Sequence, residues 1–102
     1  MMESYELSPE ALEDLLKIQD FISLDNPAAA ARLIDNFFAT FEHLAKWPGS
    51  GHSRTDLTLK PVLFRPVDSY LIVYHLQERH GLLQIVAILH AARDIPSILE
   101  GR

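Results

Sequence analysis

The spacing of apolar residues changes once along this 102-residue chain. From residue 9 to residue 45, apolar side chains recur every three or four positions, which predicts helices with one buried stripe. From residue 62 to residue 90 they form short β-branched and aromatic runs, which predict strands. A chain that separates its helices from its strands in this way folds as an α+β domain rather than as alternating α/β units.

The first helix begins at Ser8-Pro9-Glu10, which supplies a capping hydroxyl, a proline at the first helical position and an acid in the first turn. It is predicted to end near Leu24. One face carries the expected buried stripe: Ala11, Leu15, Ile18 and Ile22. The polar residues between them are expected to be solvated: Glu13, Asp14, Lys17 and Asp20.

A second helix is predicted from Asn26-Pro27, where asparagine caps and proline begins the helix, to the turn Pro48-Gly49-Ser50-Gly51. Its expected core stripe is Leu33, Phe37, Phe41 and Leu44, widened by Ile34, Phe38 and Ala45, with Trp47 also assigned to the core. His43 is expected to be exposed. The connection between the two helices is short, so they are predicted to pack as an antiparallel hairpin.

Residues 4–7 are predicted to form a short edge strand, and three further strands are predicted at 62–67, 70–76 and 82–90. Short connections make the last three an antiparallel meander, and Pro66 favours an edge position for the first of them. The expected fold is a single α+β domain over residues 1–102. In it, the helical hairpin covers one face of a three- to four-stranded, mainly antiparallel sheet, giving two layers.

Composition and charge narrow the possible functions. The chain has no cysteine, and no apolar run approaches the roughly 18 residues that span a membrane, so a cytoplasmic protein is expected. Two basic and nine acidic residues lie in 1–45, whereas seven basic and five acidic residues lie in 46–102. Only the second half can therefore present a mildly basic face, which makes free nucleic acid a poor candidate ligand. The basic residues of that face are Arg54, Lys60, Arg65, Arg79, Arg93 and Arg102.

No cofactor or metal is predicted from the sequence. The histidines that could ligate a metal are His52, His75, His80 and His90, and no pair has the close spacing of a metal site. Phosphate-loop, dinucleotide and serine-hydrolase motifs are missing from the sequence.

Five segments, in their order and spacing, resemble the ParE branch of the RelE/ParE toxin superfamily, the plasmid stabilisation toxins. They are Tyr5-Glu6-Leu7-Ser8-Pro9-Glu10-Ala11 with Asp14-Leu15, Asp25-Asn26-Pro27-Ala28-Ala29-Ala30, Trp47-Pro48-Gly49-Ser50-Gly51, Tyr70-Leu71-Ile72-Val73-Tyr74 and Leu89-His90-Ala91-Ala92-Arg93-Asp94. The resemblance implies the toxin of a type II toxin–antitoxin system. Its partner would be a small ParD-like antitoxin that wraps the toxin with one end and binds operator DNA with the other. ParE-branch toxins are associated with inhibition of DNA gyrase, whereas RelE-branch toxins cleave mRNA on the ribosome.

The chain departs from the family pattern at three positions. Ala87 and Leu63 stand where many relatives carry arginine, Ala91 replaces a glycine, and Arg65 lies two residues after Leu63. A metal-free nuclease needs a general base, a cation for the phosphorane and a general acid. The residues that could supply them are Arg65, His75, Arg79, His90 and Arg93, but the chain has only three lysines and no tyrosine after Tyr74.

The leading prediction is therefore a toxin that binds gyrase without chemistry of its own. The alternatives are a ribosome-dependent mRNA endonuclease and a degenerate toxin that only binds its antitoxin. The candidate partner-binding residues are Arg65, His90, Arg93, Ile95, Ile98 and Leu99. A structural role is also open for His90, which could close the sheet, and for Arg93, which could pair with a carboxylate such as Asp94. The apolar tail could dock on the domain or stay exposed.

Overall fold

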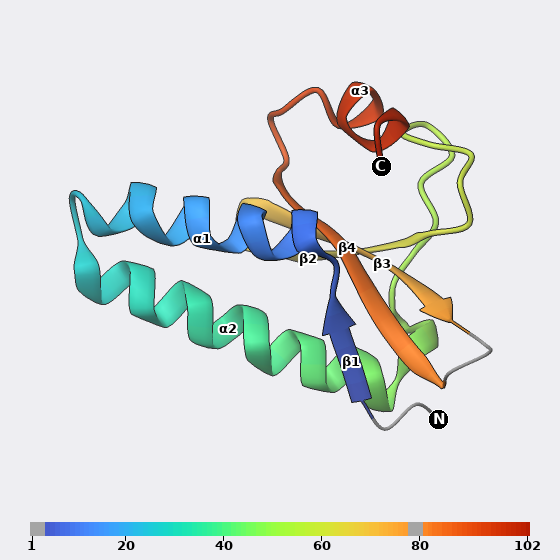
Figure 1. The fold of residues 1–102 in the computed structure, drawn as a ribbon, viewed down its shortest axis with the longest axis horizontal. Coiled ribbons are helices and arrows are strands. Elements are labelled where there is room, and N and C mark those ends of the chain that lie inside the picture. The colour runs from blue at the N-terminus through green and yellow to red at the C-terminus, as the bar shows by residue number, and fades with distance from the viewer. Residues whose placement is uncertain (1–3, 78–80) are drawn as a thin grey trace.

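The computed structural model describes residues 4–77 and 81–102, which form a mixed four-stranded sheet with helices on both faces (Figure 1). The elements follow the predicted order, with a short helix added after the last strand. They are β1 (Ser4–Leu7), α1 (Pro9–Ser23), α2 (Pro27–Lys46), the 3-10 turn η1 (Pro48–Ser50), β2 (Leu63–Val67), β3 (Tyr70–Gln77), β4 (Leu82–His90) and α3 (Ile95–Glu100). The predicted α+β class is confirmed.

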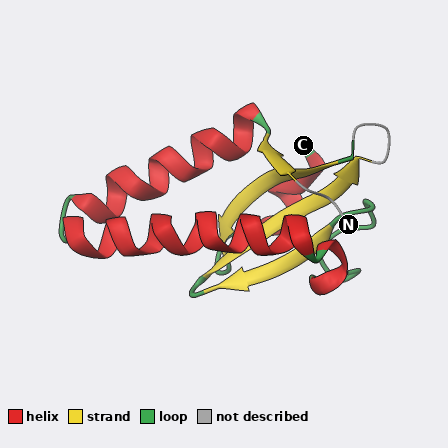
Figure 2. Cartoon of the chain, turned by 90° about the horizontal axis from the view of Figure 1, so that it is seen from below, coloured by secondary structure: helices red, strands yellow, loops and turns green. Residues whose placement is uncertain are grey.

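Both long helices begin at the predicted caps. The Ser8 Oγ accepts a hydrogen bond from the Ala11 amide at 3.1 Å, and the Asn26 Oδ1 accepts one from the Ala29 amide at 3.0 Å. A proline occupies the first turn of each helix. The two helices run antiparallel, and their connected end projects beyond the sheet (Figure 2).

The sheet has the strand order β1-β4-β3-β2. The predicted meander is present, because β2 pairs antiparallel with β3 and β3 pairs antiparallel with β4. The strand β1 adds in parallel to β4, which makes β1 and β2 the two edges. Pro66 therefore lies on an edge strand, as predicted, where its missing donor costs no ladder hydrogen bond.

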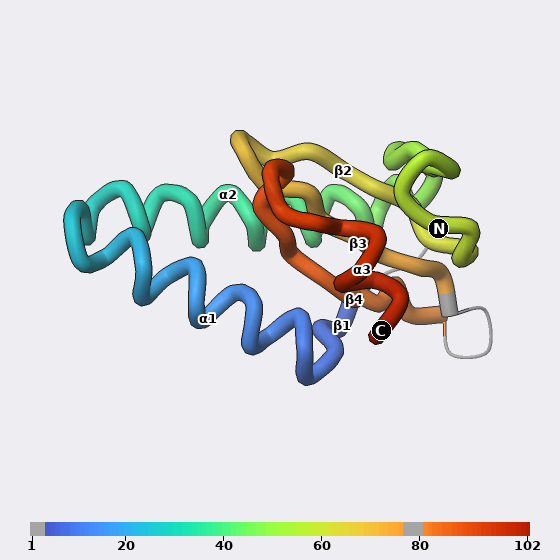
Figure 3. The backbone as a smooth tube through the Cα atoms, turned by 90° about the horizontal axis from the view of Figure 1, so that it is seen from above, coloured from blue at the N-terminus to red at the C-terminus, as the bar shows by residue number. Residues whose placement is uncertain are grey.

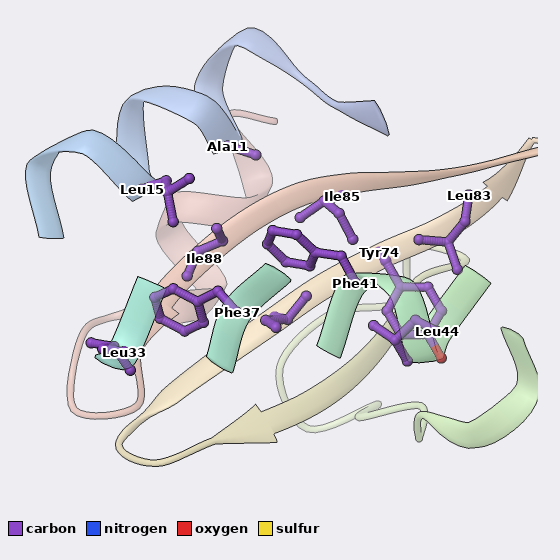
Figure 4. Close-up of a cluster of buried hydrophobic side chains, with 11 residues drawn as sticks. Ala11, Leu15, Leu33, Phe37, Phe41, Leu44, Tyr74, Leu83, Ile85 and Ile88 are labelled. Atoms are coloured by element: carbon purple, nitrogen blue, oxygen red, sulfur yellow. The ribbon is translucent and has the colours of Figure 1, made fainter. Parts of the chain in front are cut away.

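The helix-facing side of the sheet holds the larger core. Strand residues such as Ile72, Tyr74 and Ile88 pack against the apolar stripes of α1 and α2. Figure 4 shows the aromatic rings of Phe37 and Phe41 lying between α2 and the strands.

The opposite face is also covered, so the predicted two-layer arrangement is wrong. Ile95 and Leu99 of α3 are each 2% exposed, because they pack on a second apolar cluster of the sheet. The sheet residues of this cluster are Phe64, Leu71, Val73, Ala87 and Leu89. In Figure 3, α3 lies directly over β3 and β4.

Two aromatic residues assigned to the core are exposed. Trp47 is 62% exposed, because it follows the last helical residue with φ of −127° and helical spacing no longer sets its direction. Phe38 is one position away from the buried stripe and is 38% exposed, with its ring against that of Phe41 at 5.6 Å between centroids. Ile34 is half-buried, and the other members of the predicted α2 stripe are buried: Leu33, Phe37, Phe41, Leu44 and Ala45.

Candidate functional site

Asp14 was expected to be solvated and is instead 9% exposed. Its Oδ2 accepts hydrogen bonds from the Ile88 amide at 3.0 Å and from Arg102 Nη1 at 2.7 Å, and its Oδ1 accepts one from Arg102 Nη2 at 2.9 Å. Arg102 Nη1 also donates to the Val86 carbonyl at 3.0 Å. The pairing with Asp14 raises the pKa of the Arg102 guanidinium.

The Asp14–Arg102 ion pair provides hydrogen-bond partners for backbone groups of β4. The strand β1 pairs with β4 only up to Ile85, so the backbone groups of Val86 and Ile88 have no strand partner on that side. A buried backbone polar group needs a partner, and the side chains of Asp14 and Arg102 supply it. The helical spacing indicates that Asp14 is buried, because Asp14 stands three residues after Ala11 and four before Ile18, inside the apolar stripe.

The sheet register places Arg65 and His75 on opposite faces. Arg65 pairs with Ile72, whose side chain belongs to the helix-facing core, and its Nη1 lies 3.4 Å from the Ser50 Oγ. His75 is three residues further along β3, so its side chain leaves the other face. Its Nε2 lies 2.7 Å from the Gln84 Oε1.

His75 lines a hollow of about 260 Å³ next to α3, which we call the α3 pocket. Two cations also line it, but both are bonded elsewhere. Lys60 Nζ donates to the Leu99 carbonyl at 2.6 Å, and Arg102 pairs with Asp14. Ala87 is completely buried on this same face of the sheet.

The nuclease candidates are thus divided between the two faces of the sheet: Arg65 and His90 lie on the helix-facing side, and His75 lies on the side covered by α3. Arg93 follows the end of β4. Arg79 lies outside the described residues. Within 4–77 and 81–102 no group of three or more acidic or histidine side chains is arranged to hold a metal ion.

His90 and Arg93 line a second hollow of about 300 Å³ between α1 and the end of β4, which we call the α1–β4 pocket. The His90 ring lies edge-on to the Tyr70 ring, with centroids 5.3 Å apart. The His90 Nδ1 accepts a hydrogen bond from the Ala92 amide at 3.0 Å. Arg93 has no carboxylate within ion-pair distance in the described part of the chain, so the expected pairing with Asp94 is not formed.

The apolar tail is docked on the domain, which was one of its two predicted states. Ile95 and Leu99 are buried and Ile98 is half-buried, and the Ser97 hydroxyl donates to the Asp94 carboxylate at 2.7 Å. Exposed apolar residues are found on α1 and at its end instead. On this helix and at its end they are Leu12, Leu16, Phe21 and Leu24, and further exposed apolar residues among those described are Phe38, Trp47, Leu59 and Leu76.

Comparison with known proteins agrees with this fold. The structure is similar to a chain described as "Chromosomal ParDE TA system from P. aeruginosa", with a TM-score of 0.72, 17% identity, and coverage of 87% of this chain and 96% of that chain. The sequence is 27% identical over 89 residues to "Putative toxin Y4kP" of Sinorhizobium fredii (strain NBRC 101917 / NGR234), and the match covers 87% of this chain and 88% of the relative.

A family model, the ParE toxin of the type II toxin–antitoxin system parDE, matches residues 5–95. The class of protein is therefore a toxin of a type II toxin–antitoxin system. Within that class, the chain belongs to the ParE toxin family. In the described residues, no helix is long and apolar enough to cross a membrane.

Proposed function

We propose that this ParE toxin acts in the cytoplasm by binding DNA gyrase, and that a ParD-like antitoxin neutralises it. The proposal assigns no bond-making chemistry to the toxin itself. It rests on family membership together with the arrangement of the candidate catalytic side chains.

That arrangement is the observation that carries the proposal. A general base and a phosphorane-stabilising cation must reach the same phosphate within hydrogen-bond distance. Arg65 and His75 leave opposite faces of the sheet, and the hydrogen bonds of His75 and Lys60 are already committed within the protein. His90 and Arg93 do line one pocket, but that pocket adjoins α1 in the acidic first half of the chain, where a polyanion is repelled. The acidic overall charge of −5 adds an unfavourable term for binding a ribosomal RNA surface.

The test is to induce the chain without its antitoxin in a bacterial host and to pulse-label DNA and protein synthesis over the first minutes. Early loss of DNA synthesis with double-strand breaks is expected. Purified gyrase should then lose supercoiling activity when the toxin is added. Activity should return when the product of the gene adjacent to the toxin gene is added as antitoxin.

Two results would contradict the proposal. Early loss of translation with codon-periodic mRNA cuts would identify an endonuclease of the RelE type. Normal DNA and protein synthesis in cells that accumulate folded toxin would identify a degenerate member that retains only antitoxin binding.

A further inference from the structure

The α1–β4 pocket combines an apolar floor with a rim of hydrogen-bond donors. Ile18 and Phe21 of α1 meet Tyr70 and Ile88 of the sheet in this hollow, and Ile88 is only 1% exposed. Phe21 is 73% exposed, although its ring is large and apolar. A partner that covers this ring removes its apolar surface from water, which favours association.

The polar groups of the rim can all donate. A ring nitrogen that accepts a hydrogen bond carries no proton, so the contact from the Ala92 amide to His90 Nδ1 leaves the ring proton on Nε2. The basic residues Arg93 and Lys17 also line the hollow. Lys17 contacts Glu13 at 2.8 Å, but both side chains are well exposed and can exchange partners at little cost.

The one carboxylate that lines the pocket is already occupied. Both oxygens of Asp14 accept hydrogen bonds from Arg102, and one also accepts from the Ile88 amide. Arg102 thus compensates the negative charge of Asp14 on the side away from the pocket. Among the described residues, Lys17 is paired only with the exposed Glu13, and Arg93 makes no ion pair. This combination of donors suits an anionic group.

The acidic residues around the pocket favour a singly charged peptide group over a polyanion as its ligand. Residues 1–45 carry nine acidic and two basic side chains, and α1 belongs to this segment. A polyanion such as RNA would be repelled by that acidic surface. A peptide with one carboxylate beside an apolar side chain meets both the donors and the floor.

We propose that the α1–β4 pocket receives a segment of the antitoxin in which an aspartate or glutamate stands beside an apolar residue. This inference rests on the proposed function, because it requires an antitoxin partner. The carboxylate contacts Arg93 and His90, and the apolar side chain lies against Phe21 and Ile18.

Two pairs of variants test the pocket. Arg93→Ala and Phe21→Ala each remove an exposed pocket residue, so neither should disturb folding. Arg54→Ala and Leu59→Ala are matched controls, because they remove an exposed arginine and an exposed leucine that do not line the pocket. Affinity for the full-length product of the adjacent gene is measured by titration calorimetry. The pocket variants should weaken binding by about tenfold or more, and the controls should stay within about twofold.

A second measurement identifies the acidic residue of the antitoxin that binds in the pocket. Overlapping 12-residue peptides of the antitoxin are titrated into the wild-type toxin, and the binding peptide is expected to hold an acidic residue next to an apolar one. Replacing that acid by its amide should cost wild-type affinity and cost clearly less in the Arg93→Ala background, because the contact with the guanidinium is already absent there.

The possible failures are distinguishable. If the antitoxin binds wild type tightly and the two pocket variants equally well, the pocket inference is overturned and the antitoxin partner stands. If a ten-nucleotide single-stranded RNA depends on Arg93 and Phe21 while the antitoxin does not, the occupant is nucleic acid and the inference is again overturned. If the antitoxin binds no form of the toxin, the proposed function fails and the inference fails with it.

Discussion

At the scale of single residues, Gly51 and Tyr74 set the position of the turn that follows α2. The buried Tyr74 hydroxyl donates to the Pro48 carbonyl at 2.8 Å and accepts from the Gly51 amide at 2.9 Å. A Cβ atom at Gly51 would lie 2.4 Å from the Tyr74 hydroxyl, closer than packing permits.

The variant Gly51→Ala is therefore expected to lower the free energy of unfolding by about 1–3 kcal/mol, the usual cost of overpacking a filled site. Gly49→Ala is the matched control, because a Cβ there meets no heavy atom within 4 Å. Urea unfolding measures both variants. Equal stability of the two would contradict the packing argument.

Tyr74 should also make the free energy of unfolding depend on pH in the alkaline range. Burial raises the pKa of Tyr74, so the folded protein keeps the phenol proton at a pH where the unfolded chain, with a tyrosine pKa of about 10, has lost it. The stability that this group contributes is complete below about pH 10 and is lost as the pH rises through its folded pKa.

Tyr74→Phe should be less stable than wild type at pH 8 by about 1–3 kcal/mol, because the Gly51 amide and the Pro48 carbonyl lose their partner. The difference should narrow as the pH rises above about 10, because only the wild type loses the contribution of this phenol. Urea unfolding at pH 8, 10 and 11 measures it. A difference that stays constant over that range would exclude Tyr74 as the titrating group.

At the scale of elements, α3 closes the second face of the sheet. Leu99 is 2% exposed within the cluster that also holds Phe64 and Val73, and its carbonyl accepts from Lys60 Nζ. Leu99→Ala should lower the free energy of unfolding by about 2–5 kcal/mol, because it leaves a cavity in a buried cluster. Glu100→Ala, an exposed change in the same helix, should shift it by no more than about 0.5 kcal/mol. Similar unfolding midpoints for the two variants would show that α3 is only loosely held.

Elements were easier to predict than the contacts between their faces. The capped starts of α1 and α2, the strand runs and the edge position of Pro66 all follow from local chemistry that one stretch of sequence contains. The covering of the second face by α3 depends on the direction that the chain takes after β4 ends at His90, which no local pattern specifies.

A bulge in β4 is a second feature that local sequence patterns do not predict. Val73 pairs with Ala87 and Tyr74 pairs with Ile85, so one extra residue of β4 lies between them. Ile85 and Ile88 consequently share the helix-facing core although they are three residues apart. Simple alternation would place them on opposite faces. Asp14 is a related case: its place inside the apolar stripe of α1 indicates burial, but its hydrogen-bond partners depend on the early end of β1, which α1 does not specify.

At the scale of the whole molecule, the sheet separates two of the candidate catalytic residues. Arg65 belongs to the helix-facing side and His75 to the side covered by α3. Residues that act on one phosphate behave as a unit, and removing either then costs nearly as much activity as removing both. Residues that share no partner contribute independently.

This separation predicts the outcome of a double-mutant cycle. Arg65→Ala, His75→Ala and the double variant are compared by the toxin concentration that halves gyrase supercoiling. The fold-changes of the single variants should multiply to that of the double variant within about twofold, the additivity expected of separated sites. The same three variants are induced in cells, with mRNA cleavage as the second measurement. If each single variant lost as much mRNA cleavage as the double variant, the two side chains would meet at one site during action. Such a site would require the sheet face covered by α3 to open, and the gyrase proposal would then be replaced by a nuclease that rearranges on its target.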